Sequence, residues 1–345
     1  MKVLITGGAG FIGANLAERC LKRDDEVLIL DNLSRKGAAK NLDWLRSVGQ
    51  FDWINADVRD RPVISTVMKE HNDVDIVYHL AAQVAVTTSI IDPVTDFEVN
   101  AAGTLNLLSA TVEAKADPIF IFSSTNKVYG DLSSIPVAEN DLRYRWADDR
   151  RGVDETQTLD FHSPYGCSKG AADQYVIDFS RVYGLKGVVI RQSCVYGERQ
   201  FGVEDQGWVA WFGIASMLGL PMTLYGSGKQ VRDLLYVGDL LDAYDACTLH
   251  IEECRGKAFN AGGGLASSMS LLELMRFLST YHGREIHTER QAPRQGDQAI
   301  FISDNSRLER TTGWSPRMPL EDGIRRLLSW LEGERIVLES IHQTR

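Results

Sequence analysis

The sequence predicts an α/β protein built on a doubly wound parallel β-sheet. Apolar runs at residues 2–5, 27–30, 53–56, 76–80, 119–122 and 187–190 alternate with segments of helical apolar periodicity. The first run passes into glycines at three-residue spacing and then into a helical pattern, which indicates a strand, a tight turn and a helix. The 345 residues can bury a core in one large domain or two fused domains.

Composition narrows the classes of function. The seven histidines form no HExxH motif and no Cys/His cluster, so we expect no catalytic metal. The five cysteines show no CxxC spacing and are expected to be reduced thiols, and without a long apolar run we expect a cytoplasmic protein that does not span a membrane. The net charge of -10 argues against broad nucleic-acid binding but allows a local basic pocket for a nucleotide.

The glycine turn is the first candidate binding feature. Gly7, Gly10 and Gly13 leave room for a sharp turn, for a pyrophosphate against the backbone, and for the helix to pack on the strand. The helix then directs free amide groups and a positive dipole end at the phosphates. A glycine turn without any ligand would have the same sequence, so the prediction of a dinucleotide site depends on its context.

Asp31 supplies that context at the end of the second apolar run. It lies 18 residues after Gly13, close to the spacing at which a carboxylate binds the adenosine ribose diol. A carboxylate there would repel a ribose phosphate, which favours NAD over its phosphorylated form. The neighbouring Arg35 and Lys36 leave that choice open.

The third and fourth runs end in further candidates. Asp57 and Val58 lie where adenine contacts are expected, and an ordinary loop acid is nearly as good an explanation of Asp57. The small residues of Leu80–Gln83 leave space for the cofactor at the carboxyl end of a strand. Asn100 opens a helical pattern, where it could cap the helix or hold a water beside the active site.

The fifth run delivers Thr125 to the same edge of the sheet, and Tyr165 and Lys169 follow on a predicted helix. Residues four apart share a helical face, with about 5–6 Å between their Cβ atoms. A free tyrosine has a pKa of about 10, which a lysine ammonium beside it would lower. Tyr165 could then take a proton from a sugar hydroxyl as hydride leaves for NAD, with Thr125 orienting the oxygen and Lys169 holding the nicotinamide ribose. The alternatives are a surface tyrosine, a solvated lysine and a strand-end threonine.

These motifs carry a family resemblance that spans nearly the whole chain. TGGAGFIG, Asp31, HLAAQ, SSTNKVYG, YGCSK, RQSCVYG and RDLLYVGDL resemble the extended short-chain dehydrogenase/reductase family, and within it the nucleotide-sugar epimerases and dehydratases. The resemblance implies a Rossmann domain holding NAD over residues 1–190, with a return segment at about 233–262. It implies a smaller, discontinuous nucleotide-sugar domain over most of residues 191–345. The implied cofactor site comprises Gly7, Gly10, Phe11, Ile12, Gly13, Asp31, Asn32, Asp57, Val58, Leu80, Ala81, Ala82, Gln83, Asn100, Tyr165 and Lys169.

Departures from the family narrow the expected reaction. The family's sugar 4,6-dehydratases place an Asp-Glu pair directly after the catalytic threonine, whereas Asn126 and Lys127 follow Thr125 here. We therefore do not expect dehydration. The segment 131–162 is longer than in the common 4-epimerases, and a solvated excursion, an oligomer contact and a lid are equally open interpretations.

Residues 148–161 and 200–212, with SSTNKVYG, are more similar to the epimerases that act at carbon 2 of CDP-hexoses than to UDP-galactose 4-epimerases. The resemblance implies transient oxidation at carbon 2 with bound NAD and hydride return to the opposite face. The alternatives are an epimerase acting at carbon 4 or on a different sugar, an NAD-consuming dehydrogenase or decarboxylase, and a nucleotide sensor without activity.

The same resemblance implies the substrate contacts and an assembly. The expected substrate is a nucleotide diphosphate sugar, with a CDP-hexose favoured, and pairing of helices near 100–114 and 164–183 would give a homodimer or homotetramer. Arg232 and Arg294 match the family's nucleotide-binding positions and are favoured for the diphosphate, with an ordinary surface salt bridge as the alternative for either. Cys194 stands where many relatives have asparagine, which puts one phosphate contact in doubt. The expected substrate-binding residues are Ser124, Thr125, Asn126, Cys194, Gln206, Arg232 and Arg294.

Overall fold

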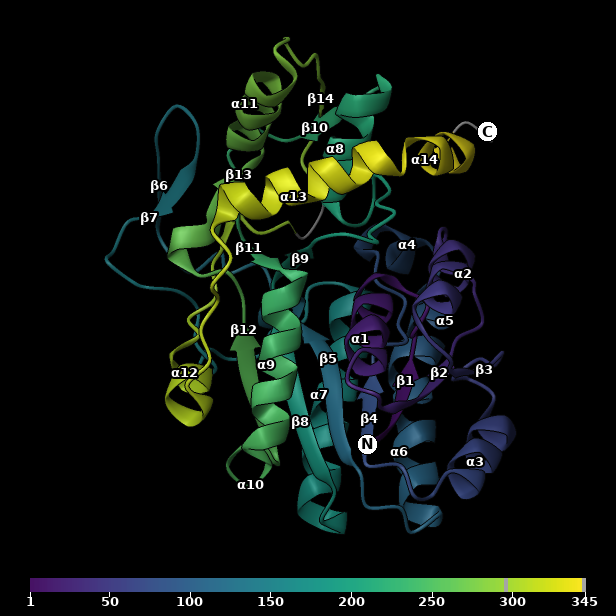
Figure 1. Cartoon of the computed structure of the whole chain (residues 1–345). Coiled ribbons are helices and arrows are strands. Elements are labelled where there is room, and N and C mark those ends of the chain that lie inside the picture. Colours follow the sequence, from purple (N-terminus) through teal and green to yellow (C-terminus); the bar gives the residue numbers. More distant parts are fainter. Residues whose placement is uncertain (295–296, 343–345) are drawn as a thin grey trace.

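The computed structural model describes residues 1–294 and 297–342. Within these ranges, a seven-stranded parallel sheet in the order β12-β8-β5-β4-β1-β2-β3 forms the larger lobe (Figure 1). Its strands are β1 (Lys2–Thr6), β2 (Glu26–Leu30), β3 (Asp52–Ile54), β4 (Ile76–His79), β5 (Ile119–Thr125), β8 (Lys186–Gln192) and β12 (Lys257–Ala261). The predicted doubly wound parallel sheet is confirmed, and β12 is a strand that the six predicted runs did not include.

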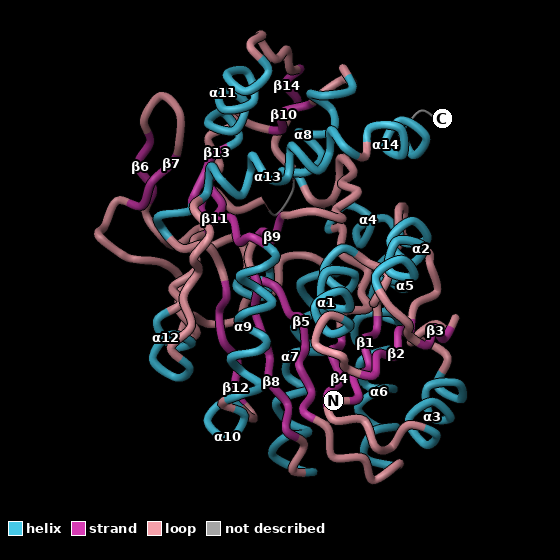
Figure 2. The backbone as a smooth tube through the Cα atoms, in the orientation of Figure 1, coloured by secondary structure: helices cyan, strands magenta, loops and turns pink. Residues whose placement is uncertain are grey.

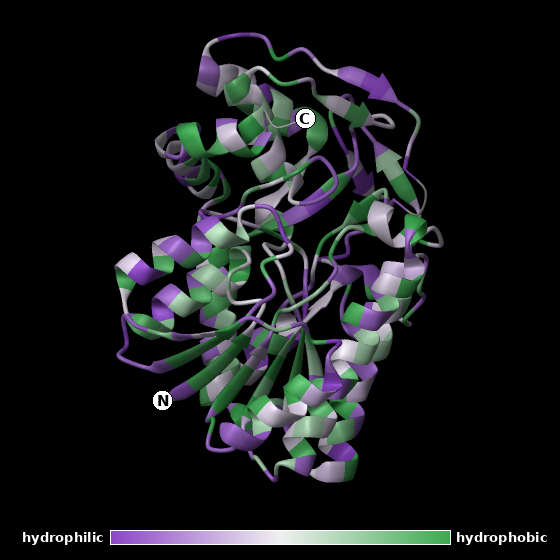
Figure 3. Cartoon of the chain, turned by 90° about the vertical axis from the view of Figure 1, so that its right-hand side faces the viewer, coloured by the Kyte–Doolittle hydropathy of each residue, from purple (hydrophilic) through white to green (hydrophobic). Residues whose placement is uncertain are grey.

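Helices cover both faces of this sheet because its strands are apolar on both sides. Val3 and Ile5 pack into one core layer and Leu4 into the other, as expected for side chains that alternate along a strand. One layer contains α1 (Phe11–Leu21), α2 (Ala38–Val48) and α9 (Val237–Leu249), and the other contains α3 (Arg61–Glu70), α6 (Gly103–Glu113) and α7 (Pro164–Tyr183). Figure 3 shows the strands as an apolar layer between these helices.

The first crossover places the glycine turn at the switch point of the sheet. Strand β1 pairs with β2 on one side and with β4 on the other, so the chain leaves β1 at the point where the strand order reverses. The short elements α4 (Val86–Ile91), α5 (Pro93–Phe97), the π-helix η1 (Glu98–Ala102) and the 3-10 helix η2 (Asn126–Tyr129) follow β4 and β5 at the same edge.

A smaller lobe lies over this edge (Figure 2). Its strands are β9 (Cys194–Tyr196), β10 (Thr223–Tyr225), β11 (Val231–Tyr236), β13 (Ser268–Ser270), β14 (Glu289–Gln291) and β15 (Ile300–Phe301). Its helices are α8 (Trp208–Leu218), α11 (Leu271–His282), α13 (Leu320–Gly333) and α14 (Arg335–His342), which share one apolar core. The helices α10 (Ile251–Cys254) and α12 (Ser306–Thr312) and the 3-10 turn η3 (Leu265–Ser267) complete the described elements.

The segment 131–162 is fastened to the smaller lobe. It contains a hairpin of β6 (Val137–Glu139) and β7 (Tyr144–Trp146). The Tyr144 amide donates a hydrogen bond to the Lys229 carbonyl at 2.9 Å, and Val153 forms an isolated parallel β-bridge with Ser303. The buried Trp146 and Val153 join a core cluster there. This packing excludes a freely solvated excursion, and the residues of the segment line neither of the two cavities described below. An oligomer contact and a lid stay predictions.

No helix in residues 1–294 or 297–342 combines the length and the apolar character needed to cross a bilayer.

Candidate active site

Two cavities meet at the carboxyl edge of the parallel sheet. The larger, of about 680 Å³, lies between the glycine turn and the strand ends, and the smaller, of about 480 Å³, lies between β5 and the smaller lobe. Tyr165, Ser124 and Gln206 line both cavities. A group bound in one cavity can therefore contact a group bound in the other.

The glycine turn is built for close backbone packing. Gly7 adopts a φ of +70°, and a Cβ there would lie 2.7 Å from the Ala81 amide nitrogen. A Cβ on Gly13 would lie 2.2 Å from the Gly7 carbonyl oxygen, so α1 can approach β1 only with glycine there. Helix α1 begins after Gly10 without a side-chain cap, which leaves the amides of its first turn facing the larger cavity.

Asp31 lies at the end of β2, as the sequence predicts. Its carboxylate accepts hydrogen bonds from the amides of Ala9 at 3.0 Å and Leu33 at 2.8 Å, which fix it against the glycine turn. Burial raises the pKa of Asp31 from its ordinary value, and these amides lower it. A ribose diol would supply two further donors to the same carboxylate, so the geometry fits the adenosine end of NAD.

The structure gathers nearly all of the predicted cofactor residues. Those that line the larger cavity are Gly7, Gly10, Phe11, Ile12, Gly13, Asp31, Asn32, Asp57, Val58, Leu80, Ala81, Ala82, Gln83, Tyr165 and Lys169. Asn100 does not line it. Its side chain is 1% exposed and lies behind the wall, where Nδ2 donates to the Gln83 carbonyl at 3.0 Å and Oδ1 accepts from the Gln83 amide at 2.9 Å. The predicted helix cap does not describe these contacts, because Asn100 lies inside the π-helix η1 and positions the Gln83 backbone. Its holding a water stays a prediction.

Tyr165 is held at the start of α7. Ser163 caps this helix by accepting from the Gly166 amide at 3.0 Å, and Pro164 occupies its first turn. The Tyr165 amide donates to Ser89 at 3.1 Å, which ties α7 to α4. Burial raises the pKa of Tyr165 to about 12, while the polar Thr125 side chain lowers it.

Lys169 lies one turn further along α7 with its side chain buried. Its ammonium donates to the Ser123 carbonyl at 2.6 Å and lies 4.2 Å from the centre of the Phe122 ring. Burial lowers the pKa of Lys169 to about 7, while the carboxylates of Asp173 and Asp96 raise it. The ammonium thus contacts a carbonyl and a ring, and stabilisation of a Tyr165 phenolate by this group stays a prediction.

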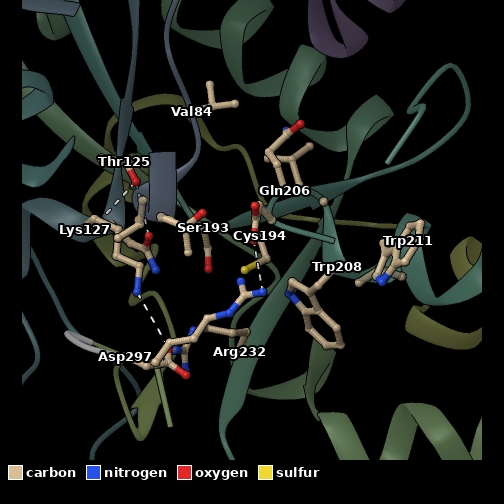
Figure 4. Close-up of a pocket in the computed structure, with 18 of the residues that line it drawn as sticks. Val84, Thr125, Lys127, Ser193, Cys194, Gln206, Trp208, Trp211, Arg232 and Asp297 are labelled. Carbon is tan, nitrogen blue, oxygen red and sulfur yellow. Dashed lines mark hydrogen bonds and ion pairs between the residues drawn. The ribbon is translucent and has the colours of Figure 1, made fainter. Parts of the chain in front are cut away.

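The smaller cavity holds the predicted substrate residues. Ser124, Thr125, Asn126, Cys194, Gln206, Arg232 and Arg294 all line it, and most of these are drawn in Figure 4. Arg232 donates to Asp297 at 2.5 Å. Arg294 lies 3.2 Å from Asp205 and stacks 4.1 Å above the Tyr225 ring. Both arginines therefore have carboxylate partners, but at the wall of a cavity rather than on an open surface. Trp208, Trp211 and Phe212 line the same cavity.

Two groups of site residues were not predicted from the sequence. The first is Asp96, which is buried and accepts a hydrogen bond from Ser168, the residue before Lys169. The sequence signal that could have identified Asp96 is its position one helical turn before Asn100. Residues 199–203 form a wall of the larger cavity, and there the Arg199 guanidinium lies 3.9 Å from the centre of the Trp44 ring. No local pattern in residues 198–202 (ERQFG) predicts that contact, because Trp44 is far away in the sequence.

Comparison with known proteins gives concordant similarities. The family model described as GDP-mannose 4,6 dehydratase matches residues 4–327. The chain is 44% identical over 335 residues to the CDP-paratose 2-epimerase of Salmonella typhi, covering 96% of this chain and 99% of that protein.

Solved structures agree with these sequence matches. The UDP-glucose 4-epimerase of Thermotoga maritima, solved with UDP-glucose, has a TM-score of 0.82 and 29% identity, covering 97% of this chain and 100% of that one. The UDP-glucose 4-epimerase of Thermus thermophilus, solved in complex with NAD, has a TM-score of 0.79 and 32% identity, covering 96% of this chain and 99% of that one.

Proposed function

This chain belongs to the extended short-chain dehydrogenase/reductase family, because the GDP-mannose 4,6 dehydratase model matches residues 4–327. We propose that it converts CDP-paratose to CDP-tyvelose by epimerisation at sugar carbon 2. The class of enzyme is an NAD-dependent nucleotide-sugar epimerase, an isomerase, and its ligand class is a nucleotide sugar. The cytosine base and carbon 2 are our proposal, supported by 44% identity to the epimerase that bears this name.

One observation carries the proposed chemistry. Tyr165 lines both cavities, and the Thr125 hydroxyl, which lowers the pKa of Tyr165, belongs to a residue that lines the smaller one. A phenol at this junction can face a sugar hydroxyl on one side and a nicotinamide on the other. A single residue can therefore move a proton while hydride moves between the occupants of the two cavities.

We assign the larger cavity to NAD, which when bound supplies a reversible hydride acceptor at the sugar carbon. Residues Gly7 to Gly13 would hold its pyrophosphate, Asp31 the adenosine ribose, and Lys169 the nicotinamide ribose. The close packing of Gly7 and Gly13 against backbone is the cradle that this assignment requires.

The protein residues then perform three tasks. Tyr165 takes the proton from the carbon 2 hydroxyl as that carbon loses its hydride, and Thr125 holds the oxygen in line. Arg232 and Arg294 retain the diphosphate while the 2-keto sugar turns over in the smaller cavity. Tyr165 then returns the proton as hydride reaches the opposite face, so the epimer forms and the cofactor ends in its starting state.

The residues after Thr125 agree with epimerisation rather than elimination. Elimination of water needs an acid and a base beside the keto sugar. The side chains that follow Thr125 in η2 are an amide, Asn126, and an ammonium, Lys127, and both line the smaller cavity. Neither is the carboxylate that the dehydratases carry at these positions.

The test is proton NMR of the purified protein in deuterated water with CDP-paratose, and separately with UDP-glucose, without added NAD. Conversion of CDP-paratose to CDP-tyvelose with hydrogen retained at carbon 2 is the expected result, because hydride transferred through bound cofactor never exchanges with solvent. Conversion of UDP-glucose alone would move the reaction to carbon 4. Net release of NADH would instead indicate a dehydrogenase or decarboxylase. No change with either sugar, even with NAD supplied, would reject both substrates.

A further inference from the structure

Lys127 places an ammonium group in the smaller cavity beside the end of β5. Its side chain is 21% exposed, and Nζ lies 3.9 Å from Oδ1 of Asp297. The same carboxylate oxygen accepts the 2.5 Å hydrogen bond from Arg232. One carboxylate therefore serves two cations at this wall of the cavity.

The charges of this group do not balance among the described residues. The other acids that line the cavity belong to a second group, in which Asp205 pairs with Arg294 and Glu204 accepts from the Tyr225 hydroxyl at 3.0 Å. Lys127, Arg232 and Asp297 carry one excess positive charge, while the second group, with two carboxylates and one guanidinium, carries one excess negative charge. Burial lowers the pKa of Lys127 to about 8, so its ammonium is still the main form at neutral pH. A cationic wall of this kind favours an anionic ligand.

The position of this charge relative to the reacting centre is fixed by the chain. Lys127 is two residues from Thr125, and its amide donates to the Thr125 hydroxyl at 3.2 Å. Figure 4 shows the Lys127 side chain extending from Thr125 toward Asp297 and Arg232. Its ammonium thus lies between the hydroxyl that orients the reacting oxygen and the guanidinium that we assign to the diphosphate.

We propose that Lys127 binds the sugar-proximal phosphate of the substrate and thereby selects carbon 2 as the reacting carbon. This inference rests on the proposed function. In a nucleotide sugar the phosphate is attached through oxygen to carbon 1, carbon 2 is the direct neighbour of carbon 1, and carbon 4 lies across the ring. A phosphate held one lysine side chain from Thr125 therefore brings carbon 2 to Tyr165 and keeps carbon 4 away. Lys127 acts as a positioning residue and makes no bond to the ring.

The test compares CDP with CMP, because only CDP has the second phosphate. Isothermal titration of the NAD-bound Lys127→Met variant should show CDP binding about 10- to 100-fold more weakly than to the unmodified enzyme, with CMP binding unchanged. Lys229→Met is the matched control, since the Lys229 ammonium pairs with Glu139 at 3.0 Å and lies outside both cavities. Equal losses for CDP and CMP, or no loss for either, would overturn the proposal.

A second readout tests the choice of carbon. Paratose has hydroxyl groups at carbons 2 and 4, so NMR of the CDP-paratose product separates the two epimers. Lys127→Met should raise KM more than it lowers kcat and should yield some carbon 4 epimer, and Lys127→Arg should restore CDP affinity. Turnover by Lys127→Met with unchanged KM and only the carbon 2 epimer would reject the assigned role.

A further set of titrations tests the Lys127 proposal separately from the proposed cytosine nucleobase. The same titrations are made with UDP and UMP. If the unmodified enzyme binds UDP and not CDP, the cytosine assignment fails, while the ratio of UDP to UMP affinity still decides whether Lys127 binds the second phosphate.

Discussion

The Asp96 carboxylate accepts a 2.5 Å hydrogen bond from the Ser168 hydroxyl, which joins the end of α5 to the helix that carries Tyr165 and Lys169. Its other oxygen accepts from Gln83 at 2.9 Å and from Asn100 at 3.2 Å. Asp96 is fully buried and receives only neutral donors in these contacts. A buried carboxylate with three neutral donors fixes the wall of the cofactor cavity relative to the predicted catalytic helix.

Replacing Asp96 with asparagine should reduce kcat and shift its pH profile toward lower pH. The Asp96 charge raises the pKa of both Tyr165 and Lys169, so the neutral amide lowers both. The NH2 of the amide also replaces one acceptor, and so faces either the Ser168 hydroxyl or the amide donors of Gln83 and Asn100, so kcat should fall by about 10- to 100-fold. Asp92→Asn, at the exposed cap of α5, is the control. A variant with reduced kcat and an unshifted profile would give Asp96 a purely structural role.

Tyr165→Phe should retain NAD and lose most turnover. The substitution removes the phenolic hydroxyl and leaves the ring at the junction of the cavities. Loss of a general base lowers kcat by about 10²- to 10⁴-fold, whereas cofactor binding depends on many other contacts. Tyr129→Phe is a matched control because its buried hydroxyl bonds Asn260 at 2.8 Å and lies outside both cavities. Full activity of Tyr165→Phe would remove Tyr165 from its role.

The sheet and the glycine turn and Asp31 that line the larger cavity could be predicted from the sequence, because they depend on local patterns. Strand β1, the glycine turn and Asp31 are consecutive signals whose spacing is fixed by one strand–helix–strand unit. Contacts between distant segments were inaccessible. Nothing in the sequence around Arg199 indicates Trp44, and nothing around Lys127 indicates that Asp297 shares its charge between two cations. Asn100 was predicted as a cofactor-binding residue, but it lies behind the wall of the cavity, because its contacts depend on a π-helix that periodicity does not reveal.

His79 should make the fold sensitive to acid. Its Nδ1 bonds Thr6 at 2.7 Å and its Nε2 bonds Thr104 at 2.9 Å. The Thr104 hydroxyl already donates to the Asn100 carbonyl, so Nε2 carries the proton and Nδ1 accepts from Thr6. Burial lowers the pKa of His79 to about 3.

The unfolded chain binds a proton at this histidine below about pH 6.5, whereas the folded chain does so only near pH 3. Stability is therefore lost as the pH falls through this interval, by on the order of 5 kcal/mol in full. Thermal unfolding from pH 7 to pH 4 should show a smaller fall in Tm for His79→Asn than for the unmodified protein. Parallel falls would contradict the assignment.

The α7 surface should mediate self-association, as the predicted homodimer or homotetramer requires. Tyr175, Val182 and Tyr183 are 42%, 62% and 57% exposed on this helix. A charge within an apolar contact is costly, so Val182→Asp should lower the mass measured by analytical ultracentrifugation. Ile336→Asp, at a position 84% exposed on α14, should not. An unmodified protein that sediments as a monomer would reject the expected assembly.

Gly37→Ala should weaken NAD retention by displacing the wall at residues 199–203. Gly37 has a φ of +84°, and a Cβ there would lie 2.3 Å from the Phe201 ring. Phe201 and Arg199 line the larger cavity, and Asn41 donates to the Arg199 carbonyl at 3.2 Å. Alanine at position 37 must therefore push the Phe201 ring toward the cavity or away from α2.

Gly283→Ala separates this steric effect from backbone strain. Gly283 also has a positive φ, of +63°, but its Cβ would meet nothing within 4 Å. Both alanines carry the strain of a residue in the left-handed region, about 1 kcal/mol. Only the alanine at position 37 contacts Phe201. Exchange of bound NAD for radiolabelled NAD should therefore be faster in Gly37→Ala and unchanged in Gly283→Ala. Equal exchange rates in the two variants would show that the 199–203 wall does not retain the cofactor.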